Sequence, residues 1–228
     1  MPRPYAELAA GCYTKLMTEA AAFDAFLGGL AGRLRQAATA DARSAEALAD
    51  FAGRVAALPG SAAAALEPQA PLAACRHWPT ALDELGAGWA RPLASLAPAL
   101  RWAQNPNYRR RPPDPDFLAN YGYAVVAGPA DGPPAPIRCE TLALGILLLG
   151  PGTHYPLHRH PAIEIYVTLS GDGDWWRDQG PWRTVPPDRV IHHASLVPHA
   201  TRAGARPLLA AYIWQGDLGR HARLIDAG

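Results

Sequence analysis

Three side chains of types that bind metal ions lie within seven residues of one another, in a stretch that reads GTHYPLHRHPAIEIYVTLSG. They are His158, His160 and Glu164. Side chains of a strand alternate between its two faces, so these three residues and Tyr166 would face one cavity if the backbone stays extended. Imidazole and carboxylate ligands together suit zinc, iron, nickel, manganese or cobalt. The stretch therefore predicts a centre for one divalent transition metal. The alternative is a half-buried strand whose histidines have only structural hydrogen bonds.

The spacing of these residues matches the first motif of the cupin superfamily, G-x5-H-x-H-x3-E-x6-G. Its five fixed positions are filled by Gly152, His158, His160, Glu164 and Gly171. The second cupin motif is degenerate in this chain and keeps only its histidine, within the run VPHA. The resemblance implies a metal held by His158, His160, Glu164 and His199.

Two neighbouring histidines, His192 and His193, compete with His199 as the ligand from a second segment. Their side chains point to opposite faces of a strand, so only one of them can face the cavity. We favour His199 as the ligand and expect His192 or His193 to orient a ligand at most. Tyr166 is predicted to be a ligand or a base, because a phenol with a pKa of about 10 in water can lose its proton beside a divalent metal. The alternative is a buried tyrosine whose hydroxyl is hydrogen-bonded.

The C-terminal half also resembles the cupin-type dimethylsulfoniopropionate (DMSP) lyases. The resemblance is carried by HYPLHRHPAIEIYVTLSG, VPHATR and LLAAYIWQGDL, and it covers about residues 120–218. It implies a divalent metal bound by His160, Glu164 and His199, with His158 as a ligand or close partner. It also implies an elimination reaction that splits DMSP into acrylate and dimethyl sulfide.

The same resemblance makes Tyr155 and Tyr166 the two candidates for the general base that removes the proton. A sulfonium cation is stabilised by aromatic faces, and several predicted strands carry aromatic residues. We expect the substrate pocket to include Tyr121, Tyr123, Trp176, Tyr212 and Trp214.

Two other functions stay open at this point. One is a cupin oxygenase that uses Fe(II), and the other is a related cupin that binds or acts on another small metabolite, with only minor lyase activity. Release of dimethyl sulfide by the purified protein tests the lyase, and oxygen uptake tests the oxygenase.

The composition of the chain limits the kinds of molecule that it is expected to bind. The formal net charge is +1 and no basic run is longer than the three arginines Arg109–Arg111, which argues against nucleic acid. The three cysteines are far apart and are expected to be reduced thiols. The N-terminus lacks the pattern of a secretory signal, and the longest apolar run, Leu142–Leu149, is too short to span a bilayer. We therefore expect a cytoplasmic protein that acts on a small molecule, without a membrane or nucleic-acid partner.

The order of predicted elements favours a mainly β protein with an α extension: a C-terminal cupin jelly-roll β-barrel preceded by an N-terminal helical region. Residues 1–104 carry apolar stripes at helical spacing, first from Tyr5 to Leu30, then in helices predicted to begin at Thr39 and Thr80. Residues 105–118 are predicted to be a linker, and 119–228 the barrel with the metal site, built from at least seven short strands. The helical region could cover the barrel, lid the pocket or form a homodimer interface.

Overall fold

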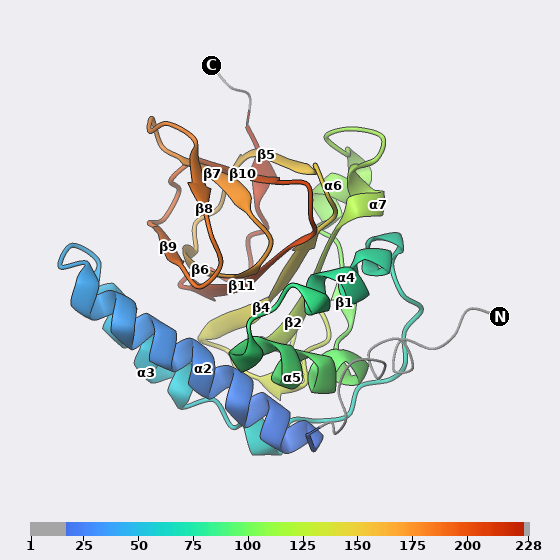
Figure 1. Ribbon diagram of the computed structural model, residues 1–228, viewed down its shortest axis with the longest axis vertical. Helices are drawn as coiled ribbons and strands as arrows, with labels where there is room; N and C mark the ends of the chain where they lie inside the picture. The colour runs from blue at the N-terminus through green and yellow to red at the C-terminus, as the bar shows by residue number, and fades with distance from the viewer. Residues whose placement is uncertain (1–16, 226–228) are drawn as a thin grey trace.

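Two β-sheets face each other in the computed structural model, which describes residues 17–225 (Figure 1). The larger sheet contains β1 (Trp102–Ala103), β2 (Tyr121–Gly128), β3 (Ile137–Arg138), β4 (Leu142–Leu149), β6 (Ile163–Ser170), β9 (Val190–His193) and β11 (Leu208–Gln215). The smaller sheet contains β5 (His154–Arg159), β7 (Gly173–Arg177), β8 (Arg183–Val185), β10 (His199–Ala203) and β12 (Arg223–Leu224). Their strand orders are β1-β2-β4-β11-β6-β9, with β3 beside β2, and β12-β5-β10-β7-β8. All pairs are antiparallel except β2–β3.

Helices cover the outer face of the larger sheet, where α2, α3 and α5 lie in Figure 1. The helices are α2 (Glu19–Ala40), α3 (Ala45–Ala56), α4 (Trp78–Asp83), α5 (Ala87–Leu96), α6 (Pro106–Arg110) and α7 (Phe117–Asn120). Short 3₁₀ turns occupy Gly60–Ala62, Ala73–His77 and Ala97–Ala99. None of the helices within residues 17–225 is both long and apolar enough to cross a membrane.

The larger sheet is buried on both faces, which explains why its central strands read as nearly continuous apolar runs. On β6, Ile165 and Val167 join one core with helix residues such as Phe23 and Leu93. Tyr166, between them, joins a second core inside the barrel, as strand alternation predicts. The same division holds along β4 and β11. One sheet thus separates a helix-facing core from the barrel interior that contains the site.

The helix starts predicted at Thr39 and Thr80 are wrong. Thr39 lies in the last turn of α2, where its hydroxyl donates to the Gln36 carbonyl at 2.8 Å, and the next helix begins after Ser44. Thr80 lies inside α4, which starts at Trp78 because Pro79 suits the first turn of a helix, where no amide donor is needed. The apolar stripes themselves are buried as expected, at Leu48, Phe51, Val55, Leu82, Trp89, Leu93 and Leu96.

The first predicted helix is described only from residue 17 onward, so its beginning, with Tyr5 and Leu8, lies outside the described residues. The predicted linker 105–118 contains α6 and the start of α7, whose Tyr108 and Phe117 side chains are buried against the barrel interior. The division of the chain into three parts stays a prediction.

The two glycines of the cupin motif allow the chain to turn at either end of the motif. Gly152 has φ +68° and Gly171 has φ +73°, values in the left-handed region that side chains with a Cβ rarely adopt. At Gly171 an added Cβ would also collide with the Pro207 carbonyl oxygen. These turns place β5 and β6, and with them the motif's side chains, in facing sheets.

Candidate metal centre

The motif's candidate ligand residues lie on two sheets and on the crossing between them, so the extended backbone that a shared strand face requires does not continue through residues 160–162. β5 belongs to the smaller sheet and β6 to the larger one, and the chain crosses between them at residues 160–162. The crossing is braced by the segment before β10, where the Leu196 amide donates to the His160 carbonyl at 2.9 Å and the Ser195 hydroxyl donates to the Pro161 carbonyl at 2.6 Å. His160 lies at the start of this crossing and Glu164 lies on β6, so the crossing brings the two side chains together.

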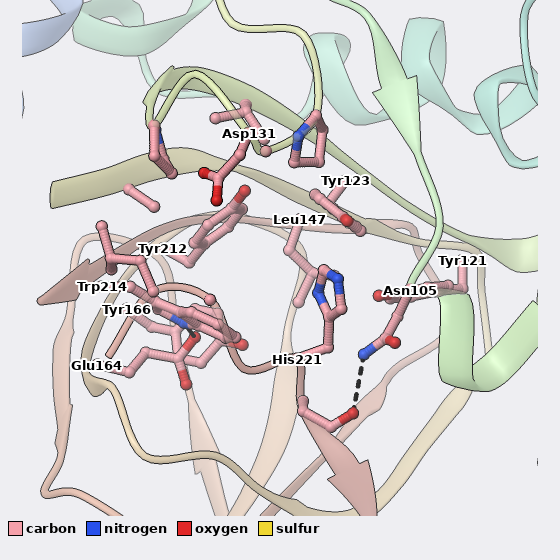
Figure 2. A pocket seen from close by; sticks show the side chains of 18 of the residues that line it. Asn105, Tyr121, Tyr123, Asp131, Leu147, Glu164, Tyr166, Tyr212, Trp214 and His221 are labelled. Atoms are coloured by element: carbon pink, nitrogen blue, oxygen red, sulfur yellow. Dashed lines mark hydrogen bonds between the residues drawn. The ribbon is translucent and has the colours of Figure 1, made fainter. Parts of the chain in front are cut away.

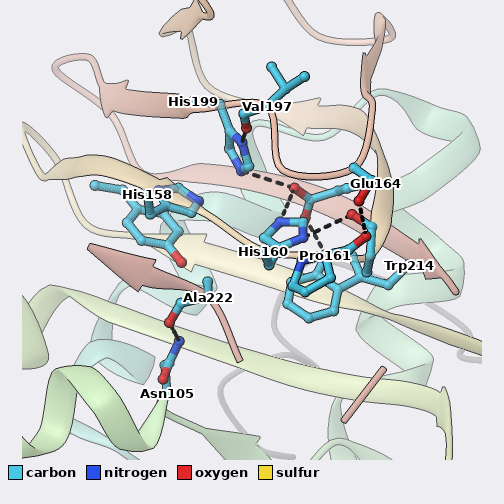
Figure 3. Close-up of polar contacts among 12 residues, drawn as sticks. Asn105, His158, His160, Pro161, Glu164, Val197, His199, Trp214 and Ala222 are labelled. Atoms are coloured by element: carbon cyan, nitrogen blue, oxygen red, sulfur yellow. Dashed lines mark hydrogen bonds and ion pairs between the residues drawn. The ribbon is translucent and has the colours of Figure 1, made fainter. Parts of the chain in front are cut away.

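Three buried residues form a tight group of metal-binding atoms: His160, Glu164 and His199 (Figure 3). Their ligand atoms all lie within 4.8 Å of one another. Glu164 Oε2 lies 3.1 Å from His160 Nε2 and 3.2 Å from His199 Nε2. The Glu164 side chain is 1% exposed, so the group is shielded from solvent. The structure thus brings together three of the four predicted ligand residues.

The histidine rings are oriented by carbonyl groups of their own segments. His160 Nδ1 lies 3.0 Å from the Ala162 carbonyl oxygen, and His199 Nδ1 lies 2.9 Å from that of Val197. A carbonyl can only accept, so each Nδ1 carries the donated proton and each Nε2 of a neutral ring presents a lone pair. Both Nε2 atoms then face Glu164 Oε2, and His199 Nε2 has no aligned hydrogen bond to any described residue. Lone pairs that converge in this way fit a bound cation, and backbone carbonyls that orient ligating histidines are usual at metal sites.

Trp214 holds the Glu164 carboxylate in place. Its indole Nε1 donates to Glu164 Oε1 at 2.6 Å, and its ring stacks on His160 at 4.1 Å between centroids and 27° between planes. Burial alone would raise the pKa of Glu164, but without a bound cation a protonated His160 ring, through its charge and its hydrogen bond, would hold that pKa well below its usual range. Glu164 is therefore an ionised carboxylate with a fixed orientation.

His158, the fourth predicted ligand, lies beside the group. Its nitrogens are not among the atoms that lie within 4.8 Å of one another. Its ring stacks on Tyr155 at 4.0 Å and meets the His199 ring edge-on at 4.1 Å. Burial and the neighbouring His199 lower the pKa of His158 well below 6.5. His158 is thus a neutral ring that packs against His199 of the candidate metal centre.

The two rival histidines face opposite ways, as their adjacent positions predict. His192 points toward the helices, with Nδ1 3.3 Å from the Ser44 hydroxyl. His193 points into the barrel, is 1% exposed and stacks on His199 at 4.1 Å and 11°. Neither ring nitrogen of His193 has a hydrogen-bond partner within the described part of the chain. His193 therefore supports the His199 ring by stacking.

A cavity opens beside this group, and most of the predicted site residues line it (Figure 2). Those that do are Tyr121, Tyr123, Tyr155, Glu164, Tyr166, Tyr212 and Trp214. Trp176 does not line the cavity, and its prediction as a pocket residue is wrong. Alternation along β7 turns Trp175 inward instead, 4.9 Å from the Tyr166 ring, and leaves Trp176 half-buried on the other face.

Other lining residues were missed by sequence reasoning because they lie on connecting segments. Asn105 precedes α6, Asp131 follows β2, and His221 follows β11. Asn105 and Asn107 both donate side-chain hydrogen bonds to the Ala222 carbonyl at 3.0 Å and so hold the segment after β11 against the barrel. No sequence motif marks these positions, since only tertiary packing brings them to the cavity.

The two candidate bases have different neighbours. The Tyr155 hydroxyl lies 3.1 Å from the Tyr108 hydroxyl. Burial raises the pKa of Tyr155 well above 10, and the surrounding tyrosines raise it further. Burial also raises the pKa of Tyr166 well above 10, and the next largest cause is the negative charge of Glu164. Of the two candidates, Tyr166 is thus the one whose pKa would fall if a positive charge neutralised the Glu164 carboxylate.

Two facing antiparallel sheets with a buried His–Glu–His group between them define this protein as a cupin, with a helical region before the barrel. The DMSP lyase family model matches residues 48–210, which is more than half of the chain. The chain therefore belongs to the DMSP lyase family, and the predicted fold class and family are confirmed.

Two curated proteins that resemble this chain are named as a DMSP lyase and a putative DMSP lyase. The chain is 38% identical over 103 residues to the DMSP lyase DddQ of Ruegeria pomeroyi, across 45% of this chain and 49% of that protein. It is 32% identical over 146 residues to the putative DMSP lyase DddL of Cereibacter sphaeroides, across 62% of this chain and 58% of that protein. The chain thus spans about half the length of the curated relatives it matches.

Solved structures support the same fold. The crystal structure of DddQ from Ruegeria pomeroyi DSS-3 aligns with a TM-score of 0.63 at 24% identity, over 84% of this chain and 95% of that chain. A second structure, from work on the DMSP lyases RdDddP and RnDddQII, aligns with a TM-score of 0.60 at 23% identity, over 79% and 95% of the two chains. At this level of identity the likeness concerns the fold.

Proposed function

We propose that this protein is a metal-dependent carbon–sulfur lyase that splits DMSP into acrylate and dimethyl sulfide. The observation that carries the proposal is that one cavity is lined both by Glu164, from the His–Glu–His group, and by the Tyr166 phenol. Membership of the DMSP lyase family supports the choice of substrate.

His160, Glu164 and His199 would hold the divalent cation, because their lone pairs converge and their rings and carboxylate are already oriented. Zinc, iron, manganese, nickel and cobalt all suit two imidazoles and one carboxylate. When bound, the cation would supply Lewis-acid stabilisation of charge near the substrate carboxylate and would lower the pKa of the nearby phenol.

Tyr166 acts as the general base. Its phenolate oxygen takes the proton from the carbon next to the substrate carboxylate, and the electron pair of that C–H bond forms the new C=C bond. The C–S bond breaks and its electron pair leaves with sulfur, so the sulfonium departs as neutral dimethyl sulfide and needs no acid. Trp175 packs against the Tyr166 ring and limits its movement.

In this proposal Tyr155 has a positioning role: it holds the neighbouring His158 ring in place. Its hydroxyl is hydrogen-bonded to the Tyr108 hydroxyl, and its ring stacks on His158. The His158 ring in turn packs against His199. The phenol most directly coupled to Glu164 is that of Tyr166. The two tyrosines therefore have different roles, although both line the cavity.

The test is headspace detection of dimethyl sulfide from purified protein that has been stripped of metal and then reloaded with single divalent ions. We expect turnover only after reloading. Tyr166→Phe should lower kcat about a hundredfold or more, the usual scale for loss of a general base. Tyr155→Phe should have a smaller effect and should leave the metal content unchanged. Turnover by Tyr166→Phe at the wild-type rate would exclude this phenol as the base.

A further inference from the structure

The cavity lining has an unusual balance of charge. Among the described residues that line it there is no lysine or arginine, and there are two carboxylates, Glu164 and Asp131. Glu164 belongs to the metal-binding group. Asp131 comes from the loop between β2 and β3, and Figure 2 shows its carboxylate turned into the cavity toward the Tyr212 ring. A cavity with this lining suits a ligand that carries a positive charge.

Hydrogen bonds hold the loop that carries Asp131 in place. The Gly132 amide donates to the Pro129 carbonyl at 3.2 Å, which closes a turn around Asp131. The Ala130 amide donates to Glu140 Oε1 at 3.3 Å, and the Cys139 amide donates to the Gly128 carbonyl at 2.9 Å. The Asp131 carboxylate itself makes no hydrogen bond or ion pair with any residue that the structure describes. Its negative charge is thus available to a ligand.

Aromatic rings lie next to this carboxylate. The Tyr123 and Tyr212 rings meet edge-on, with centroids 6.1 Å apart and planes at 78°. The Tyr212 and Trp214 rings are 6.3 Å apart with planes at 65°. All three rings line the cavity. Differently inclined rings present π-faces in more than one direction, and such faces attract alkylated cations.

We propose that Asp131 is a specificity-determining residue that recognises the cationic end of the substrate, together with the rings of Tyr123 and Tyr212. The inference rests on the proposed function, because it assigns the two ends of a zwitterion to the two ends of the cavity. The substrate carboxylate lies at the His–Glu–His group, where a bound cation would neutralise it, whereas the rest of the described lining holds no lysine or arginine and a single histidine, His221. The sulfonium lies by the loop that follows β2, and Asp131 discriminates against substrates that lack a positive charge.

The experiment measures direct binding by calorimetry to the metal-loaded protein, with two ligands that keep the carboxylate. One is 3-(trimethylammonio)propionate, which carries a cation and a poorer leaving group than a sulfide. The other is 4-methylpentanoate, the neutral isostere of DMSP. Asp131→Asn should weaken binding of the cationic ligand about threefold to fivefold, the scale of a solvent-screened ion pair, and should leave the neutral ligand unaffected. The difference in affinity for the cationic ligand between the wild type and Asp131→Asn should shrink as the salt concentration is raised.

Asp172→Asn is the matched control, because Asp172 is an exposed carboxylate in a turn outside the cavity lining and its loss changes the net charge equally. It should bind both ligands as the wild type does. Equal weakening of both ligands by Asp131→Asn, no weakening of either, or failure of the wild type to prefer the cation would overturn the inference. A protein that shows the expected preference without releasing dimethyl sulfide would refute the lyase proposal and leave the cation subsite standing.

Discussion

Substitution of Trp214 by Phe tests whether the indole–carboxylate contact organises the metal-binding group. Phe keeps an aromatic ring that can stack on His160 but removes the Nε1 donor that lies 2.6 Å from Glu164 Oε1. The carboxylate then loses the bond that fixes one of its oxygens while the other faces His160 and His199. We expect Glu164 to become less well oriented and metal affinity to fall.

The size of the effect follows from the type of bond. A hydrogen bond to a charged acceptor contributes about 1.5–3 kcal/mol. At about 1.4 kcal/mol per factor of ten, this corresponds to a loss of about 10- to 100-fold in affinity. Partners that orient metal ligands from behind typically show the same range when they are removed. We therefore expect Trp214→Phe to raise the metal Kd at least about tenfold.

The assay is a competition titration of zinc between the protein and a chromophoric chelator. Trp175→Phe is the control, since Trp175 is buried in the same barrel but its Nε1 has no hydrogen-bond partner among residues 17–225. The zinc affinity of Trp175→Phe should match that of the wild type. An unchanged Kd for Trp214→Phe, or an equal loss in both variants, would refute the idea that this contact organises the ligand group.

Three further outcomes are expected. His160→Ala should abolish stoichiometric metal binding in elemental analysis while the circular dichroism spectrum stays that of the wild type. Burial lowers the pKa of His158 and His193 below 6.5, so the unfolded chain binds protons that the folded chain excludes. Urea unfolding of the metal-free protein should then show stability that is complete above about pH 6.5 and falls by about 1.4 kcal/mol per pH unit below it for each such histidine; a flat profile would contradict this. Gly171→Ala should cost about 1–3 kcal/mol of unfolding free energy in thermal melts, because its φ is positive, whereas Gly53→Ala, in a helix with open space around it, should not destabilise the protein.

The chemistry-bearing residues were predictable because their spacing is short and specific. His160 and Glu164 lie four residues apart, and His199 follows within a recognisable run. The condition given for their convergence, an extended backbone through residue 161, is not met, however. Alternation along one strand does not bring them together, since the chain leaves the smaller sheet after β5 and enters the larger one at β6. The same motif spacing therefore describes two facing strands and the crossing between them.

Helix ends were less predictable than helix faces. The apolar stripes at Phe51 and Leu93 are buried as their spacing indicates, because periodicity reports which face packs. The starts at Thr39 and Thr80 were misplaced because a threonine hydroxyl can bond within a helix as readily as it can cap one.

By itself, the sequence determined the fold class and the family, and it predicted the three residues of the candidate metal centre, because these depend on residue types at fixed separations along the chain. Only the tertiary structure decided that His158 stands beside the ligand group, that Trp175 and not Trp176 faces inward, and that Asp131 reaches the cavity. Those outcomes depend on sheet pairing, strand phase and the path of connecting segments. Such features are set by contacts between residues far apart in the sequence, and local patterns do not encode them.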